Sequence, residues 1–338
     1  MTKQKMTGAQ KNLFIIWNPF QRRSESLAAI FDLQTKYYHY DWEERGKFFK
    51  LLSYIPKFYL TMHALVKYKP RYVFLQLAPT PLLYAAAMYR MLTGNHYISD
   101  CHNTMIYDDH WIKWPFAKSL LRRSYITLIH NEDVRELANR INIPSMILRD
   151  PLPVMEVAED VETVAGISIK KTKYVIIPCG MAADEPVAEL FDAARAVPDV
   201  LFVMTWFKEG LPADTLSKAP ENMCFTGFLS ERNFNALFAN ANAAIVLTTR
   251  EGTQPSGASE AIALGVPIIL SEIRTTKRLY MDAPVFVKNE PESIAAGICI
   301  ALENGEQLSA KIAGLRENLA NDVSAQVDAV KRLMTEGA

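Results

Sequence analysis

Residues 249–271, TREGTQPSGASEAIALGVPIILS, decide the fold because they join a loop to a short helix and then to a buried strand. The apolar run AAIVL at residues 243–247 comes directly before them and predicts another buried strand. Residues 258–264 predict a helix of small residues that ends at Gly265. Strand, loop, helix and strand make a βαβ unit, which indicates an α/β domain with a parallel sheet.

The start of this helix predicts a site for an anion. Pro255, Ser256 and Gly257 lie where the helix begins, so free backbone amides and the positive end of the helix dipole favour a diphosphate there. Glu251 comes before the turn and Glu260 about one helical turn inside it, so two carboxylates can accept hydrogen bonds from the hydroxyls of a sugar or ribose. The alternative is an ordinary helix start whose acids are solvated.

The segment resembles the donor site of GT-B glycosyltransferases, in particular the large retaining family with a paired-glutamate motif, the family 4-like enzymes. Residues 260–267, EAIALGVP, follow the family pattern closely, whereas Glu251 lies one residue further from Glu260 than in that pattern. The resemblance implies that Glu260 binds the ribose hydroxyls and that Glu251 approaches the transferred sugar. It also implies a nucleotide-sugar donor, most often UDP-linked, as co-substrate.

The chain has no acidic D-x-D motif to hold a metal–diphosphate pair, no P-loop and no G-x-G-x-x-G loop, so we expect transfer without a metal or a bound cofactor. The leaving group would be met by backbone amides and cations. Family members often carry an Arg and a Lys after the first strand of the donor domain, but residues 180–185 read GMAADE here. The predicted donor-binding residues are Arg250, Gly252, Gln254, Ser256, Gly257, Ala258, Glu260, Phe228, Leu229 and Lys277.

The rest of the chain alternates strand and helix patterns, which favours parallel sheets covered by helices. Strands are expected in the first half at 13–17, 37–40, 72–77, 97–100 and 125–130, and in the second at 174–179, 200–206, 223–226, 243–247, 267–270 and 285–287. Helices are expected at 46–68, 80–92, 131–141, 186–196, 231–240, 258–264, 291–303 and 307–334, the last interrupted near 321–322.

This alternation predicts two Rossmann-like domains that face each other across a cleft, the GT-B arrangement. Residues 1–152 would form the acceptor-binding domain, and residues 153–338 the domain for the nucleotide sugar. The C-terminal helix would pack back on the first domain.

Asp100 and His102 are the predicted catalytic residues of the acceptor side, together with Glu251 of the donor loop. Asp100 ends the strand expected at 97–100 and His102 follows it, at the edge where parallel sheets bind ligands. If the reaction inverts the anomeric centre, Asp100 would take the acceptor proton. If it retains configuration, the resemblance implies that His102 contacts the sugar or phosphate. The alternative is structural, with Asp100 capping a turn and His102 packing. Arg22 and Arg23 at the first helix are candidate phosphate ligands.

Charge is distributed unevenly, although the 37 basic and 37 acidic residues cancel. Residues 1–150 hold 21 Lys and Arg against 12 Asp and Glu, which leaves 16 against 25 for the remainder. Cations interleave with aromatic residues at 45–71 and 111–123, which predicts contact with an anionic membrane surface. The alternative for the uneven charge is a surface bias without a partner, and the alternative for residues 111–123 is a core helix with a solvated basic face. No nucleic-acid motif accompanies the charge.

The sequence predicts a cytoplasmic location, peripheral on the inner face of the membrane. Residues 1–11 lack the apolar stretch of a signal peptide, and four widely spaced cysteines suit a reducing compartment.

The resulting functional prediction is a glycosyltransferase of hexosyltransferase type. It would move a sugar from a UDP-sugar to a glycan or polyprenyl-linked glycan in bacterial surface-polysaccharide assembly. Two alternatives are a sugar-nucleotide epimerase of GT-B type and a catalytically degenerate GT-B partner subunit. The missing Arg/Lys pair and the shifted glutamate spacing motivate the second.

Overall fold

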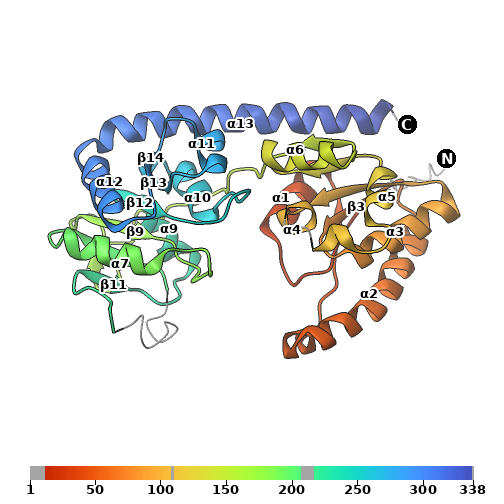
Figure 1. Cartoon of the computed structure of the whole chain (residues 1–338), viewed down its shortest axis with the longest axis horizontal. Helices are drawn as coiled ribbons and strands as arrows, with labels where there is room; N and C mark the ends of the chain where they lie inside the picture. The colour runs from red at the N-terminus through yellow and green to blue at the C-terminus, as the bar shows by residue number, and fades with distance from the viewer. Residues whose placement is uncertain (1–11, 108–109, 207–216, 337–338) are drawn as a thin grey trace, which may run out of the picture. The chain divides into compact units, whose positions relative to one another are not determined.

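The computed structural model describes residues 12–107, 110–206 and 217–336 (Figure 1). Its internal contacts divide the chain into two units. The N-domain comprises Met1–Pro151 and Val323–Ala338, and the C-domain comprises Leu152–Asp322. Each holds a six-stranded parallel sheet, which confirms the prediction of two Rossmann-like domains.

The N-domain sheet has the order β2-β1-β3-β4-β5-β6. Its strands are β1 (Leu13–Ile16), β2 (Gln34–Tyr37), β3 (Tyr72–Leu77), β4 (His96–Cys101), β5 (Thr127–Ile129) and β6 (Ser145–Ile147). The helices and 3-10 turns between them are α1 (Arg22–Phe31), η1 (Asp41–Arg45), α2 (Lys47–Tyr68), α3 (Thr80–Thr93), α4 (Asn103–Ile106), η2 (Trp111–Lys113), α5 (Ala117–Arg122) and α6 (Glu132–Arg140).

Alternation along the N-domain strands builds a core on each face of the sheet. Leu13 and Ile15 of β1 pack with α2, α3, α5 and α6. Phe14 and Ile16 pack on the other face with α1 and with Val330 from the end of the last helix. Both faces of the inner strands are covered, so β1 and β3 are buried along their whole length, whereas the edge strand β2, QTKY, is only half-buried.

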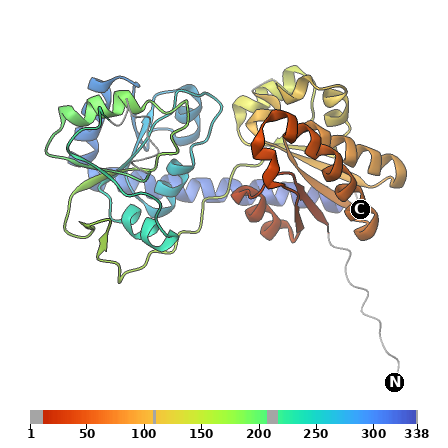
Figure 2. The same cartoon turned by 90° about the horizontal axis from the view of Figure 1, so that it is seen from below.

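The C-domain sheet has the order β11-β10-β9-β12-β13-β14. Its strands are β9 (Tyr174–Ile177), β10 (Leu201–Met204), β11 (Met223–Phe225), β12 (Ala243–Val246), β13 (Ile268–Ser271) and β14 (Val285–Val287). Its helices are α7 (Val187–Ala196), α9 (Glu231–Ala239), α10 (Ser256–Leu264), α11 (Arg274–Tyr280) and α12 (Pro291–Glu303), and α13 (Gly305–Glu336) begins in this domain. Figure 2 shows helices on both sides of each sheet.

Several elements depart from the prediction. Strand β2 lies at Gln34–Tyr37 rather than at 37–40, and β6 and α11 were not expected. Helix α13 runs without interruption, so the break expected near residues 321–322 is wrong, although the boundary between the two units falls at Asp322. Near its start the C-domain contains a small antiparallel hairpin, β7 (Thr163–Val164) and β8 (Ile167–Ser168), that was not expected. The described helices include none that is long and apolar enough to cross a membrane.

Candidate functional site

The C-domain sheet has its topological switch point between β9 and β12. Strand β9 pairs with β10 on one side and with β12 on the other. The strands that follow β9 continue outward to β11 on one side, and those that follow β12 continue outward to β14 on the other. Open parallel sheets bind ligands beside the carboxyl ends of such strands. A small apolar pocket lies there, lined by Ile177, Pro178, Cys179, Glu185, Pro186, Val187, Leu190, Ile245, Val246 and Leu247.

Helix α10 begins directly against this switch point. A Cβ atom at Gly257 would come within 2.6 Å of Pro178 Cγ and within 3.1 Å of Val246 Cγ2, so only glycine allows this close approach. Pro255 is the N-cap residue and supplies no side-chain hydrogen bond to the first turn. The start of α10 therefore presents backbone amides beside the ends of β9 and β12, the arrangement that binds a phosphate elsewhere.

The two predicted glutamates differ in their surroundings. Glu260 lies inside α10 and is only 8% exposed. Glu251 instead caps α11, because its carboxylate accepts hydrogen bonds from Arg274 N at 3.0 Å, Thr275 N at 3.1 Å and Thr275 Oγ1 at 2.8 Å. Partial burial acts to raise the pKa of Glu251, but these hydrogen bonds outweigh it and lower the pKa. The carboxylate expected beside the transferred sugar therefore already has structural partners.

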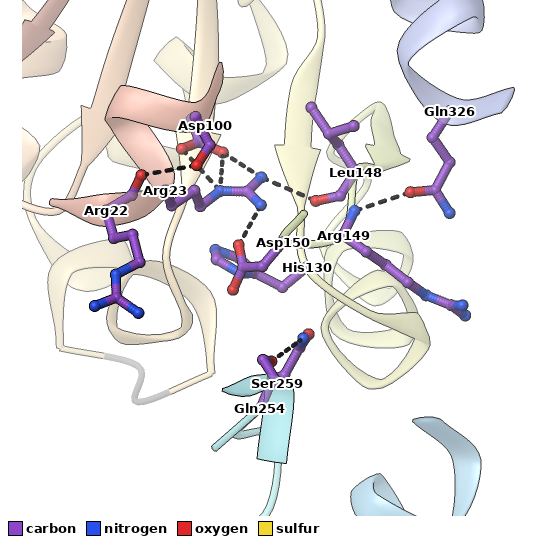
Figure 3. Close-up of polar contacts among 11 residues, drawn as sticks. Arg22, Arg23, Asp100, His130, Leu148, Arg149, Asp150, Gln254, Ser259 and Gln326 are labelled. Atoms are coloured by element: carbon purple, nitrogen blue, oxygen red, sulfur yellow. Dashed lines mark hydrogen bonds and ion pairs between the residues drawn. The ribbon is translucent and has the colours of Figure 1, made fainter. Parts of the chain in front are cut away.

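Most other donor-side residues predicted from the sequence lie in the loop between β12 and α10 or in its first turn. Gly252 has φ +75° and its amide donates to Thr275 Oγ1 at 2.8 Å, so a left-handed glycine and a hydroxyl shape the loop. Gln254 Nε2 donates to Ser259 Oγ at 3.2 Å (Figure 3), while Gln254 Oε1 is buried without a partner among the described residues.

The remaining predicted donor residues have varied environments. The Arg250 amide donates to Thr248 Oγ1 at 3.0 Å. Lys277 is exposed and pairs with Glu272 at 2.6 Å. Phe228 is 80% exposed, with its ring centroid 6.5 Å from that of Trp206. Ser256 is exposed, Ala258 is buried and Leu229 is half-buried against the C-domain core.

The loop after β9 holds an arrangement that the sequence did not reveal. Glu185 accepts hydrogen bonds from Gly180 N at 3.1 and 3.2 Å, from Ala182 N at 3.2 Å and from Cys179 Sγ at 3.0 Å. Burial and the Glu185 carboxylate together raise the pKa of the Cys179 thiol to about 12. The acidic pair Asp184-Glu185 in place of the expected cations was the signal, but its contacts require the folded loop.

A buried ion cluster lies at the carboxyl ends of the N-domain strands (Figure 3). Arg23 Nη2 donates to Asp100 Oδ1 at 2.7 Å and to Leu148 O at 2.9 Å, and Arg23 Nη1 donates to Asp150 Oδ1 at 2.5 Å. Burial opposes the charged forms, but the ion pairs outweigh it, so the pKa values of Asp100 and Asp150 are lowered and that of Arg23 is raised.

This cluster bears on two expectations from the sequence. Asp100 has no exposed surface and is held by Arg23, which favours the structural alternative over a role as the base that takes an acceptor proton. Arg23 is only 6% exposed and committed to two carboxylates, so it is not placed to bind a phosphate, whereas Arg22 at the start of α1 is exposed. Asp150 was not expected at this site, since it is far from Arg23 in sequence.

Two histidines lie beside the cluster. His102, directly after β4, and His130, directly after β5, have ring centroids 5.0 Å apart. His130 Nδ1 lies 3.4 Å from Asp150 Oδ1. Burial and the neighbouring His130 lower the pKa of His102 to about 4, despite the opposing effect of Asp100, so its imidazole is neutral near pH 7. The Nε2 atoms of both rings are buried and lack a partner among the described residues. This edge of the N-domain thus brings two imidazole rings together beside the ion cluster.

Comparison with known proteins identifies the fold. Residues 215–318 match the family model described as glycosyl transferases group 1, and this range contains the donor loop and α10. A search of curated proteins found no match. Among solved structures, sucrose-phosphate synthase from Thermosynechococcus elongatus superposes with a TM-score of 0.73 at 10% identity, covering 97% of this chain and 100% of that one. Its fold is that of the GT-B glycosyltransferases.

Two further structures share this GT-B fold. Anabaena HepE in complex with UDP and glucose gives a TM-score of 0.70 at 10% identity, covering 96% of this chain and 100% of that chain. The E. coli trehalose-6-phosphate structure bound with UDP-2-fluoro glucose gives 0.69 at 10% identity, covering 96% and 99%. The GT-B fold that the resemblance of residues 249–271 implied is thus confirmed. Over the described residues, no three His, Cys, Asp or Glu side chains gather as a metal site would need.

Proposed function

We propose that this chain transfers a sugar from a UDP-sugar, with the donor bound by the C-domain. The proposal rests on the start of α10. Gly257 allows this helix to pack closely against the ends of β9 and β12, and Glu260 is buried one turn further on. This segment lies inside the region that matches the glycosyl transferases group 1 family. Two proteins with the same fold, HepE and the E. coli protein, were solved with UDP or a UDP-sugar analogue.

The proposed donor mode follows from the placement of these groups. The diphosphate lies at the start of α10, where amides and the helix dipole stabilise the charge that develops on the leaving group. Glu260 accepts hydrogen bonds from the ribose hydroxyls, and the base stacks on the exposed ring of Phe228. Transfer without a metal is part of the proposal, since amides take the role that a cation would otherwise have.

Titration with UDP and UDP-sugars tests this donor site directly. A ligand at 100 times its Kd stabilises the folded protein by about 2.7 kcal/mol, so thermal unfolding in the presence of a series of nucleotides should rank UDP-sugars first. A series in which no nucleotide raises the unfolding temperature would contradict the proposed donor site.

The acceptor side is proposed from an exposed apolar face on α2. Phe48, Leu52, Ile55, Tyr59 and Val66 are 68%, 41%, 59%, 69% and 58% exposed, respectively. Their spacing of three, four and seven residues places them on one face of the helix. A continuous exposed apolar face of this kind is typical of an interaction surface rather than of a solvated helix.

The charge of α2 favours an anionic membrane as the partner. The helix contains no Asp or Glu, and Lys47, Lys50 and Lys67 are exposed. Its fourth lysine, Lys57, is buried and pairs with Glu43 at 2.7 Å, so it belongs to the inner face. Apolar side chains with flanking lysines bind the boundary between headgroups and acyl chains. We therefore propose that α2 brings the enzyme to a membrane that carries a polyprenyl-linked or other lipid-linked glycan acceptor in bacterial surface-polysaccharide assembly.

The second basic and aromatic segment, residues 111–123, is packed differently. Ile112 and Leu121 are buried, and Trp111 and Trp114 pack against the N-domain core, so Phe116 is its one large apolar side chain that is well exposed. These contacts favour the alternative that we gave for this segment, a packed element with a solvated basic face. The proposed membrane contact therefore lies on α2.

Two charge-matched variants test the membrane contact. Replacing Lys47, Lys50 and Lys67 by Gln should reduce sedimentation with phosphatidylserine vesicles, because each cation near such a surface contributes about 1 kcal/mol. The control replaces Lys113, Lys118 and Arg123 by Gln, which removes the same charge from the other segment and should leave sedimentation nearly unchanged. Equal losses in both variants, or wild-type protein that stays in the supernatant, would contradict an α2 contact.

A degenerate partner subunit is the second candidate, and one observation favours it. Where the family carries an Arg and a Lys, the loop after β9 presents Asp184 and Glu185, and the Glu185 carboxylate binds the loop's own amides. Turnover separates the two candidates. A partner subunit binds a nucleotide sugar without releasing UDP, whereas the transferase releases UDP when an acceptor is present.

A further inference from the structure

The loop after β9 is a small anion-binding site that already holds an anion. The amides of Gly180 and Ala182 and the thiol of Cys179 all donate to the Glu185 carboxylate, at 3.0 to 3.2 Å. The two amides lie two residues apart, and the Met181 amide between them donates to Cys179 Sγ at 3.4 Å. Backbone amides that point to one centre form the kind of concavity that binds phosphate oxygens in other proteins. A carboxylate bound there stands in for a phosphate oxygen.

This loop is fixed to the proposed donor segment of the same domain. Thr249 N donates to Asp184 O at 2.8 Å, and Thr248 Oγ1 donates to Asp184 Oδ2 at 2.5 Å, so the acidic loop and the start of the donor loop are joined. Pro178, at the other end of the acidic loop, lies so close to Gly257 in the first turn of α10 that a Cβ there would come within 2.6 Å of Pro178 Cγ. Glu185 also lines the small pocket at the switch point.

We propose that Glu185 is a resident competitor of the donor's phosphates. A phosphate oxygen of the bound donor replaces its carboxylate on the amides of Gly180 and Ala182, and the Glu185 side chain moves away. This inference rests on the proposed function, because it names a residue of the same donor site that lowers the affinity for the donor. Its physical basis is that two anions cannot share one set of amides, and that residues 180–185 hold no Lys or Arg to neutralise the pair.

The competition has a consequence for ligand preference. Binding of a nucleoside diphosphate must displace Glu185, whereas binding of the nucleoside alone leaves it in place. Affinity for UDP is therefore reduced by the competitor, and affinity for uridine is not. A merely structural role for Glu185, as a brace for its own loop, would change unfolding without this difference between the two ligands.

Calorimetric titration of the full chain with UDP and with uridine tests the proposal. Glu185→Gln keeps the shape of the side chain but removes its charge, and UDP should bind about tenfold more tightly, a change of about 1.4 kcal/mol. Uridine should bind the variant and the wild type equally. The matched control is Glu189→Gln, which removes the same charge from the first turn of α7 and should leave both affinities unchanged.

Several outcomes would overturn the proposal. If the wild type and Glu185→Gln bind UDP equally well, Glu185 does not compete with the donor, but the proposed donor site still stands. A gain for uridine as large as the gain for UDP means that the pocket changed shape in general. If neither protein binds UDP, the proposed function fails and this inference fails with it. Glu185→Ala is titrated in parallel and should show the same selective gain if Glu185→Gln does not fold.

Discussion

Replacing Glu260 by alanine is expected to weaken UDP binding about tenfold to a hundredfold. Glu260 is 8% exposed and lies one helical turn inside α10, so in the proposed complex its carboxylate meets the ribose hydroxyls away from solvent. A hydrogen bond to a charged acceptor contributes roughly 1.5–3 kcal/mol, and each 1.4 kcal/mol is a factor of ten in Kd. The size of the effect follows from burial, because an exposed carboxylate would exchange its contact for water at little loss.

Isothermal titration with UDP measures this change, and circular dichroism checks that the variant is folded. Glu317→Ala is the control, because Glu317 is exposed on the part of α13 that belongs to the C-domain, and its removal should leave the affinity unchanged. A folded Glu260→Ala protein with wild-type affinity would refute the assignment of α10 as the nucleotide site.

Four further results are expected. Gly257→Ala should destabilise the C-domain by about 1–3 kcal/mol in urea unfolding, because its Cβ would meet Pro178 Cγ at 2.6 Å. Glu251→Ala should lower stability by roughly 0.5–2 kcal/mol, since it removes the cap of α11, and an unchanged urea midpoint would argue against that cap. Asp100 has a lowered pKa in the folded state, so its contribution to the free energy of unfolding is present above its ordinary pKa of 3.8 and is lost as the pH falls through the folded pKa. Acid unfolding of the Arg23→Met variant should therefore occur at a higher pH than that of the wild type. Turnover should persist in EDTA, and activity that returns only with added Mg²⁺ or Mn²⁺ would contradict a metal-independent reaction.

The sequence predicts the two sheets well for a physical reason. Most of their strands are covered on both faces, so they appear as short apolar runs between turn residues. The half-buried edge strand β2, QTKY, lacks such a run, and the prediction placed it three residues too late. The bounds expected for β3, β14 and α12 coincide with those of the structure. The strand β6 was missed because it is a three-residue edge strand that begins with a serine, and α11 was missed because its sequence, RTTKRLY, has little apolar periodicity.

The candidate site residues could be predicted only where their contacts are local in sequence. Local features, such as the start of α10 after Pro255, are encoded in consecutive residues, whereas the need for glycine at position 257 arises from Pro178 and Val246. Contacts between distant residues are not, and Arg23 meets Asp150 across 127 positions. The basic segments at 45–71 and 111–123 look alike in sequence, and only the packed structure shows that the apolar side chains of α2 remain exposed while most of those in the other segment are covered.

Sugar transfer itself is the measurement that tests the central claim most directly. The wild-type protein is incubated with a series of UDP-sugars and with vesicles made from extracted bacterial membrane lipids, and UDP release is measured together with the mass of the lipid fraction. We expect one UDP-sugar to release UDP while a lipid-linked glycan gains the mass of one sugar residue. We also expect the Glu260→Ala variant to lose most of this activity. Nucleotide binding without UDP release from any UDP-sugar of the series would contradict it.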